Sequence, residues 1–206
     1  MRLGKNSVRY TGLLAGALLA GTLIALAAPA SPARAQAAVT TDDIVNRLGG
    51  LEATAEVSVP VLRQRALERA KSKADPVPLK RPPVATELLK LPRLAFEVKF
   101  DPDSSIIRPE SYQTLGRLAD ALVRSTLLPY GFLIVGHTDS TGKREYNLTL
   151  SQRRADSIRD ALVTTFKISS KRLQAIGLGE EQLQDSAHPA AAINQQLQVV
   201  TVAKAS

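Results

Sequence analysis

Four polar side chains around a predicted turn and helix start have the types and the spacing of a ligand site. The segment GHTDSTGKREYNLTLSQRRA contains Asp139 and, further on, Asn147, Ser151 and Arg154. On a helix that advances about 100° per residue, the last three fall within a sector of about 60°. Buried polar groups without partners cost about 1 to 3 kcal/mol each. The pattern therefore predicts that a ligand or a neighbouring segment meets this polar face.

An acid and an arginine that converge at the end of a strand can together bind a zwitterion. The carboxylate of Asp139 would hold an ammonium group, and the guanidinium fork of Arg154 would hold a carboxylate through two hydrogen bonds. Each residue also has an ordinary structural interpretation. An aspartate commonly stabilises a turn, and an arginine commonly forms a weak surface ion pair. The interpretation as a site depends on the two side chains lying together.

The elements that would hold this face come from residues 93–204, where the hydrophobic pattern becomes regular. LAFEVKF alternates as a half-buried strand does, and GFLIVGH, KRLQAIGLGE and QQLQVVTVA are further strand candidates. Apolar residues recur at helical spacing after Pro109, which predicts a first helix there. A second helix is expected over residues 144–166. This alternation predicts an α/β domain in which helices pack on a small sheet in two layers. Asp139 then follows a strand end, where open sheets bind ligands.

The first 35 residues have the features of an export signal. Basic residues precede an apolar run over residues 12–28, and the small-x-small triplet at residues 33–35 predicts cleavage before Gln36. An uncleaved membrane anchor is the alternative, because about 17 to 20 apolar residues approach the length of a spanning helix. Residues 1–35 carry four of the 27 Lys and Arg and no acid, so cleavage lowers the formal charge from +8 to +4. The chain has no cysteine, which excludes disulfides and thiol chemistry.

Residues 36–92 are expected to form an N-terminal arm with a linker. A short capped helix is predicted within TTDDIVNRLGGL, with Thr41 or Asp42 at its start and the pair Gly49 and Gly50 at its end. Residues 61–74 have many basic and few apolar side chains, which predicts a solvated helix. A basic surface for an anionic membrane, a wall polymer or a protein partner is the alternative. Four prolines within residues 75–84 predict an extended linker.

The sequence favours a binding module over an enzyme. It has two histidines and no cysteine, and no serine lies in the G-x-S-x-G pattern of a nucleophile elbow. His137 and Asp139 flank Thr138 without the further ligands that a metal site needs. A hydrolase that uses His137 and Asp139 is the weaker alternative, and no cofactor is expected.

Residues 136–162 resemble the OmpA-like peptidoglycan-binding domain, whose core pattern is G-H-T-D, then G, then N, then L-S-x-x-R-A. VKFDPDSSIIRPES upstream and RLQAIGLGEEQL downstream extend the resemblance to about residues 94–203. It implies an α+β type of sandwich, with helices on a small mixed sheet, that binds peptidoglycan non-covalently through the diaminopimelate of the peptide stem. It also implies a periplasmic protein without enzymatic activity, associated with the cell wall and the outer membrane.

The resemblance assigns roles to individual residues. Asp139 matches the acid that binds the diaminopimelate ammonium, and Arg154 matches the arginine that binds its carboxylate. Other positions of the pattern shape the pocket. The predicted peptidoglycan-binding set is Thr138, Asp139, Asn147, Leu150, Ser151 and Arg154.

One segment departs from the family pattern. Before its last strand the family commonly has N-R-R-V, where this chain has NQQLQVV with Gln195 and Gln196. Neutral amides cannot supply the charge of two arginines, so we expect weaker binding that is still carried by Asp139 and Arg154. If the departure is costly, arginines at both positions strengthen binding. A stator-like relative that keeps its N-terminal helix in the inner membrane is the alternative, and it would use the same wall site.

Overall fold

The computed structural model describes residues 39–50, 57–72 and 81–204. These residues lie within the second of the two units into which the chain divides, residues 38–206. The predicted export signal, the alternative anchor and residues 75–80 of the predicted linker lie outside the described ranges. None of the described helices is long and apolar enough to cross a membrane.

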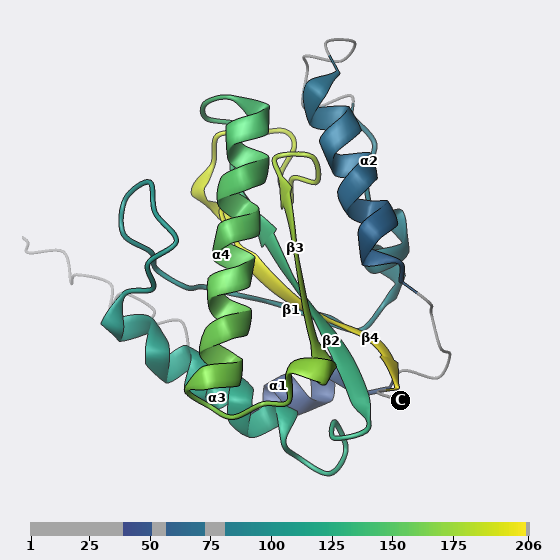
Figure 1. The fold of residues 1–206 in the computed structure, drawn as a ribbon, viewed down its shortest axis with the longest axis vertical. Helices are drawn as coiled ribbons and strands as arrows, with labels where there is room; N and C mark the ends of the chain where they lie inside the picture. The colour runs from purple at the N-terminus through teal and green to yellow at the C-terminus, as the bar shows by residue number, and fades with distance from the viewer. Residues whose placement is uncertain (1–38, 51–56, 73–80, 205–206) are drawn as a thin grey trace, which may run out of the picture. The chain divides into compact units, whose positions relative to one another are not determined.

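Among the described residues, four strands form one mixed sheet: β1 (Arg93–Phe96), β2 (Tyr130–His137), β3 (Leu173–Gly179) and β4 (Leu197–Lys204). Their order is β1-β4-β2-β3, with β2 and β3 parallel and the other pairs antiparallel (Figure 1). Successive side chains of a strand point to opposite faces. Phe132 and Ile134 accordingly belong to one core, and Leu133 and Val135 belong to the other. The sheet therefore has two apolar faces that need cover.

Three helices cover the first face: α1 (Thr41–Leu48), α3 (Tyr112–Leu122) and α4 (Arg144–Thr164). Figure 1 shows α4 lying along the sheet, where it connects the parallel strands β2 and β3. Leu118 of α3 and Ile158 of α4 are buried in one core with Phe132 and Ile134. A mixed four-stranded sheet packed with helices confirms the predicted fold class, and α4 matches the helix predicted over residues 144–166.

Helix α1 begins with a capping box and belongs to the same core. Oγ1 of Thr40 accepts the backbone N–H of Asp43 at 3.1 Å, and the Asp43 carboxylate accepts the backbone N–H of Thr40 at 3.1 Å. Two donors at the helix start are thereby satisfied. Ile44 and Leu48 are buried on the inner side. The short predicted helix is confirmed, and it packs on the domain.

Helix α2 (Val59–Lys71) packs on the second face of the sheet, so the prediction of a solvated helix over residues 61–74 is wrong. Leu62, Ala66 and Ala70 of this helix are buried. Two of these three buried side chains are alanines, which are short. The apolar stripe of α2 is therefore narrow, and the helix can lie close to the sheet. The prediction failed because a weak apolar stripe is sufficient when it packs against a largely apolar surface.

Residues 81–91 continue this cover, where the sequence predicts the end of an extended linker. Val84 and Ala85 are buried in the second core, and the side chain of Arg81 is 5% exposed. The described end of the predicted linker is therefore packed structure.

The short 3-10 helices of the described residues are η2 (Thr86–Lys90), η3 (Pro109–Ser111), η4 (Ser170–Arg172) and η5 (Ala192–Asn194).

Two glycines let α4 lie very close to the sheet. A Cβ added at Gly136 would lie 2.3 Å from the carbonyl oxygen of Ser151, and one at Gly177 would lie 2.2 Å from the backbone nitrogen of Gln152. Both contacts are far below a van der Waals separation of about 3.5 Å. Glycine at these two positions therefore sets the distance between α4 and the sheet, and with it the place of the polar face of α4.

Side chains of α4 occupy the outer edge of β3. Ser151 accepts the backbone N–H of Gly179 at 2.9 Å, and Gln152 accepts the backbone N–H of Gly177 at 2.8 Å. An edge strand with unpaired groups is a template for pairing with another chain. The contacts satisfy part of this edge and fix the position of α4 along the sheet.

Candidate functional site

Asp139 lies in the turn after β2, and its carboxylate is fixed by two donors. Its Oδ1 accepts the backbone N–H of Thr141 at 2.8 Å, and its Oδ2 accepts Nε2 of Gln195 at 2.5 Å. The residue is buried. The first contact is the turn-stabilising bond of the ordinary interpretation. Because both donors are neutral, the carboxylate is oriented while its charge is not cancelled by them.

Asn147 joins the start of α4 to this turn. Its Nδ2 lies 3.2 Å from the carbonyl oxygen of Asp139, 3.1 Å from that of Thr141 and 2.8 Å from Oε2 of Glu180. An amide group has two hydrogens, so the three acceptors share them. The side chain is buried. Asn147 therefore positions the backbone that carries Asp139.

The remaining predicted residues differ in their surroundings. Ser151 is fully buried, and its Oγ donates to the carbonyl of Leu148 at 2.9 Å while it accepts from Gly179. Leu150 is half-buried on the same helix. Thr138 is buried, and its hydroxyl makes no hydrogen bond within the described part of the chain. Ser151 thus attaches α4 to β3 through a hydrogen bond, whereas Thr138 has a hydroxyl that is free among the described residues, directly before the acid in the sequence.

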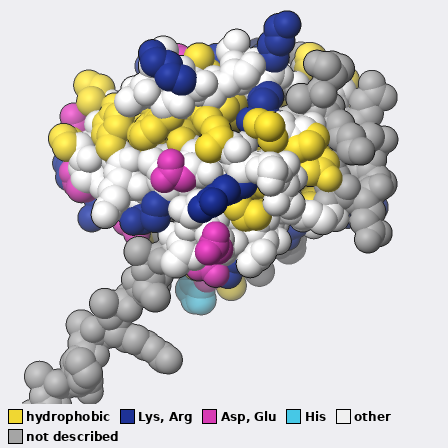
Figure 2. All heavy atoms as spheres, turned by 90° about the horizontal axis from the view of Figure 1, so that it is seen from below, with side chains coloured by type: hydrophobic (Ala, Val, Ile, Leu, Met, Phe, Trp, Pro, Cys, Tyr) yellow, Lys and Arg dark blue, Asp and Glu magenta, His cyan; other side chains and the backbone are white. Residues whose placement is uncertain are grey.

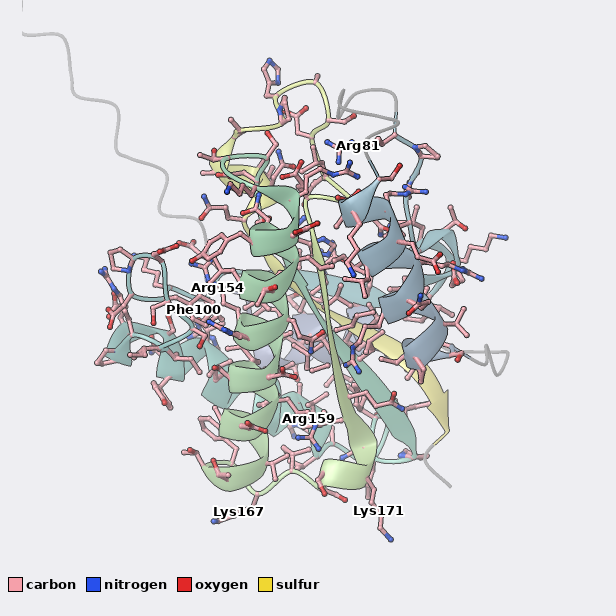
Figure 3. All side chains as sticks on the ribbon, turned by 45° about the horizontal axis from the view of Figure 1, so that its top comes forward. Arg81, Phe100, Arg154, Arg159, Lys167 and Lys171 are labelled. Carbon is pink, nitrogen blue, oxygen red and sulfur yellow. The ribbon has the colours of Figure 1, made fainter. Side chains whose placement is uncertain are left out.

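Arg154 lies about one turn after Ser151 on α4, and the segment after β1 orients its side chain. Its Nε donates to the carbonyl of Ser104 at 3.0 Å, and its guanidinium carbon lies 5.0 Å from the centre of the Phe100 ring (Figure 3). Burial lowers the pKa of Arg154, and nearby acidic groups that include Asp139 oppose this shift. Arginine stays protonated in proteins. The contacts therefore hold a half-buried cation in one orientation.

Asp139 and Arg154 lie close enough for their charges to interact. The charge of Asp139 acts on Arg154, yet no ion pair within 4.0 Å joins the two in the described ranges. Opposite charges that are near each other but not paired can each take a complementary group of a zwitterion. The two residues that the sequence pattern couples are therefore within electrostatic range of each other, and their joint role stays a prediction.

The two glutamines of the departing segment have different positions. Gln195 is exposed and donates to Asp139, whereas Gln196 is half-buried and its backbone carbonyl accepts the N–H of His137 at 3.0 Å. A neutral amide satisfies one lone pair of the acid and leaves its charge in place. Of the two, Gln195 reaches the site. The effect of arginines at these positions stays a prediction.

A buried asparagine that sequence reasoning missed holds the loop opposite the acid. Nδ2 of Asn194 donates to the carbonyls of Asp185, His188 and Pro189 at 3.0 to 3.1 Å, and its Oδ1 accepts the Asp185 N–H at 2.8 Å. The carbonyl of Pro189 also accepts the N–H of Ser140 at 3.0 Å. The loop is therefore attached to the residue after the acid. A signal was present, since Asn194 opens the segment NQQLQVV.

His137 is buried at the end of β2 and gives no support to the hydrolase alternative. Within the described chain, neither ring nitrogen makes a hydrogen bond of normal geometry. Burial lowers the pKa of His137 to about 4, and a backbone contact with Gln182 opposes this only in part. A general base is most effective with a pKa near the operating pH, so this one is poorly matched to neutral conditions. No group of three or more His, Cys, Asp or Glu within the described ranges is placed to hold a metal ion.

We expect the protonation of His137 to reduce stability in acid. Its pKa of about 4 in the folded protein lies below the ordinary value of 6.5, so the unfolded chain binds the proton more tightly. The stability contribution is complete above pH 6.5 and is lost as the pH falls through this range to about 4. At about pH 4.5 the loss amounts to roughly 2 to 3 kcal/mol. Urea unfolding near pH 7.5 and pH 4.5 should show a correspondingly smaller loss for His137→Gln. An equal loss in both proteins would exclude His137 as the cause.

Comparison with protein families matches residues 99–196 to the OmpA family. Outer membrane porin F of Pseudomonas aeruginosa is 38% identical over 90 residues, which cover 44% of this chain and 25% of the porin. The peptidoglycan-associated lipoprotein of Brucella melitensis biotype 1 is 43% identical over 83 residues, which cover 40% of this chain and 48% of the lipoprotein. The chain thus spans less than half of the length of each of these relatives.

A solved structure also aligns with this chain. It is the OmpA-like domain of FopA1 from Francisella tularensis subsp. tularensis SCHU S4, with 18% identity and a TM-score of 0.46 over 55% of this chain and 75% of that one. The assignment rests on the family match and on the sequence relatives. Residues 99–196 of this chain form a domain of the OmpA family.

Proposed function

We propose that this chain binds peptidoglycan through the diaminopimelate of the stem peptide. Diaminopimelate carries ammonium and carboxylate groups on one carbon, and the candidate site holds a carboxylate and a guanidinium. One observation carries the proposal. Asp139 and Arg154 are each oriented by neighbouring groups, and no ion pair joins them within the described residues. Such a pair of fixed charges complements a zwitterion.

The role proposed is non-catalytic anchoring or organisation of the cell envelope, in the periplasm and in association with the cell wall and outer membrane. The OmpA family match supports it, as do relatives named outer membrane porin and peptidoglycan-associated lipoprotein. The recognition is non-covalent and needs no cofactor, because the charges of the two side chains supply it.

A specific site explains binding better than a general basic surface does. On the face shown in Figure 2, basic and acidic side chains are interspersed around hydrophobic ones. All three arginines of α2 contact the chain itself: Arg65 forms an ion pair with Glu87 at 2.8 Å, while Arg63 and Arg69 donate to the carbonyls of Ala175 and Pro82. The basic segment of residues 61–74 therefore has less charge to offer a membrane or protein partner than its sequence indicates.

The experiment that tests the proposal is co-sedimentation of the purified chain with sacculi that contain diaminopimelate. We expect the chain to pellet with the sacculi and free diaminopimelate to release it. Sacculi whose stem peptides contain lysine in place of diaminopimelate serve as the control, because they lack the second ammonium-carboxylate pair. A folded chain that stays in the supernatant, or that pellets equally with both kinds of sacculi, would contradict the proposal.

A further inference from the structure

A buried cluster of four charged side chains lies at the end of the domain where α4 begins. Arg81 comes from the segment before β1, Arg144 from the first turn of α4, and Glu180 and Glu181 from the loop after β3. Figure 3 shows Arg81 between the ends of α2 and α4. The side chains of Arg81, Glu180 and Glu181 are 5%, 4% and 1% exposed. Charges so deeply buried require partners.

Both arginines contact Glu181, and Arg81 also contacts Glu180. Arg144 binds Glu181 with both ends of its fork, at 2.8 Å from Nε to Oε1 and 2.7 Å from Nη2 to Oε2. Arg81 donates from Nη2 to Oε1 of Glu180 at 3.1 Å, and its Nη1 lies 3.3 Å from Oε2 of Glu181. Among the described residues, Arg81 is the cation that pairs with Glu180. Without Arg81, the carboxylate of Glu180 would be buried and uncompensated.

Glu180 connects this cluster to the candidate site. Its Oε2 accepts Nδ2 of Asn147 at 2.8 Å, the shortest of the three contacts of that amide. The same amide holds the carbonyls of Asp139 and Thr141. A continuous series of contacts thus leads from Arg81 through Glu180 and Asn147 to the backbone of the acid. A carboxylate acceptor fixes which way the amide points, so the charge of Glu180 determines how the turn is held.

We infer that Arg81 is a positioning residue for peptidoglycan recognition, and this inference rests on the proposed function. Arg81 holds Glu180 in place, Glu180 orients the amide of Asn147, and Asn147 positions Asp139. Arg81 precedes residues 99–196, the range matched by the OmpA family. Recognition in this chain therefore depends on a segment outside the family domain. The buried cluster gives the N-terminal segment a role in the site in addition to its cover of the sheet.

The test compares binding to diaminopimelate-containing sacculi for Arg81→Met and for a matched arginine. Arg63 is the control, because its guanidinium donates to the carbonyl of Ala175 at 3.2 Å and joins α2 to β3 away from the acid. We expect Arg81→Met to weaken binding about tenfold, as coupled groups in one network do. Arg63→Met should bind as the wild type does. Wild-type binding is measured in the same series, so that a failure of the proposed function is seen separately.

A second variant separates positioning from a general structural role. Glu180→Gln keeps an oxygen for Asn147 and removes the buried charge, so Arg81→Met should weaken binding little in a Glu180→Gln background. A loss that is equal in both backgrounds would overturn the inference, as would wild-type binding by folded Arg81→Met. If Arg81→Met does not fold, Arg81→Lys replaces it, and the side-chain amide resonances of Asn147 are measured by NMR. We expect them to shift in Arg81→Lys and to stay in place in Arg63→Met, and unchanged resonances in Arg81→Lys would refute the series of contacts.

Discussion

Asp139→Asn should lower the affinity of this chain for diaminopimelate-containing sacculi by about 100-fold, because the change removes a charge and keeps the shape of the side chain. The amide can still accept the N–H of Thr141, so the turn is expected to survive. What is lost is the attraction for the ligand ammonium. Binding isotherms from co-sedimentation at one fixed ionic strength measure the effect.

The matched control for the acid is Asp120→Asn on α3. Asp120 is exposed, and the change removes the same charge from the molecule as Asp139→Asn does. If the site is specific, Asp120→Asn binds as the wild type does. If the two variants lose affinity equally, net charge rather than the site governs binding.

The arginine end of the site is tested by Arg154→Lys beside Arg153→Lys. Lysine keeps the charge of Arg154 and loses the fork that binds a carboxylate through two hydrogen bonds, so affinity should fall about tenfold or more. Arg153 is the exposed neighbour on the same helix, and its replacement should have no effect. Wild-type affinity in Arg154→Lys would mean that the ligand carboxylate binds elsewhere.

Gly177→Ala should lower the free energy of unfolding by about 3 kcal/mol or more, the upper range for an overpacked core. The added Cβ would meet the backbone nitrogen of Gln152 at 2.2 Å and Oγ of Ser151 at 2.6 Å. Backbone cannot rotate away as a flexible side chain can, so α4 must move from the sheet. That movement also displaces Arg154 relative to Asp139, and affinity for sacculi should fall with stability.

Gly116→Ala on α3 is the matched control for this substitution. Its Cβ would meet the ring of Phe166 at 3.6 Å, an ordinary contact. Alanine in the middle of a helix is favoured over glycine by about 0.5 to 1 kcal/mol, so this variant should be as stable as the wild type or more stable. Urea unfolding of both variants provides the comparison. Equal stability of Gly177→Ala and the wild type would show that α4 is less tightly placed than its contacts indicate.

The sequence by itself determined the elements of the domain and the two charged residues of the proposed site. Alternation in LAFEVKF and GFLIVGH marks strands, and helical spacing marks α4, because side-chain direction repeats with a fixed local period. The same period placed Asn147, Ser151 and Arg154 on one side of α4. The turn after β2 placed Asp139 at a strand end. These are local properties, and a local pattern is sufficient to predict them.

The tertiary structure alone decided what these residues contact. Gln195 reaches Asp139 across 56 positions, and Glu180 reaches Asn147 across 33. The polar face of α4 is met in part by the chain itself, since Ser151 is satisfied by β3 rather than presented to a ligand.

Helix α2 and the residues around Arg81 were the part that sequence reasoning placed wrongly, because their role depends on a distant surface. Helix α2 has a weak apolar stripe when read alone, and it is buried because the second face of the sheet is apolar. Arg81 reads as part of a proline-rich linker, and it lies in a buried ion-pair cluster because Glu180 and Glu181 lie there. Burial and ion pairing depend on which surfaces meet, and the distances at which they meet are set by contacts such as that of Gly177 with α4. No local period encodes those distances.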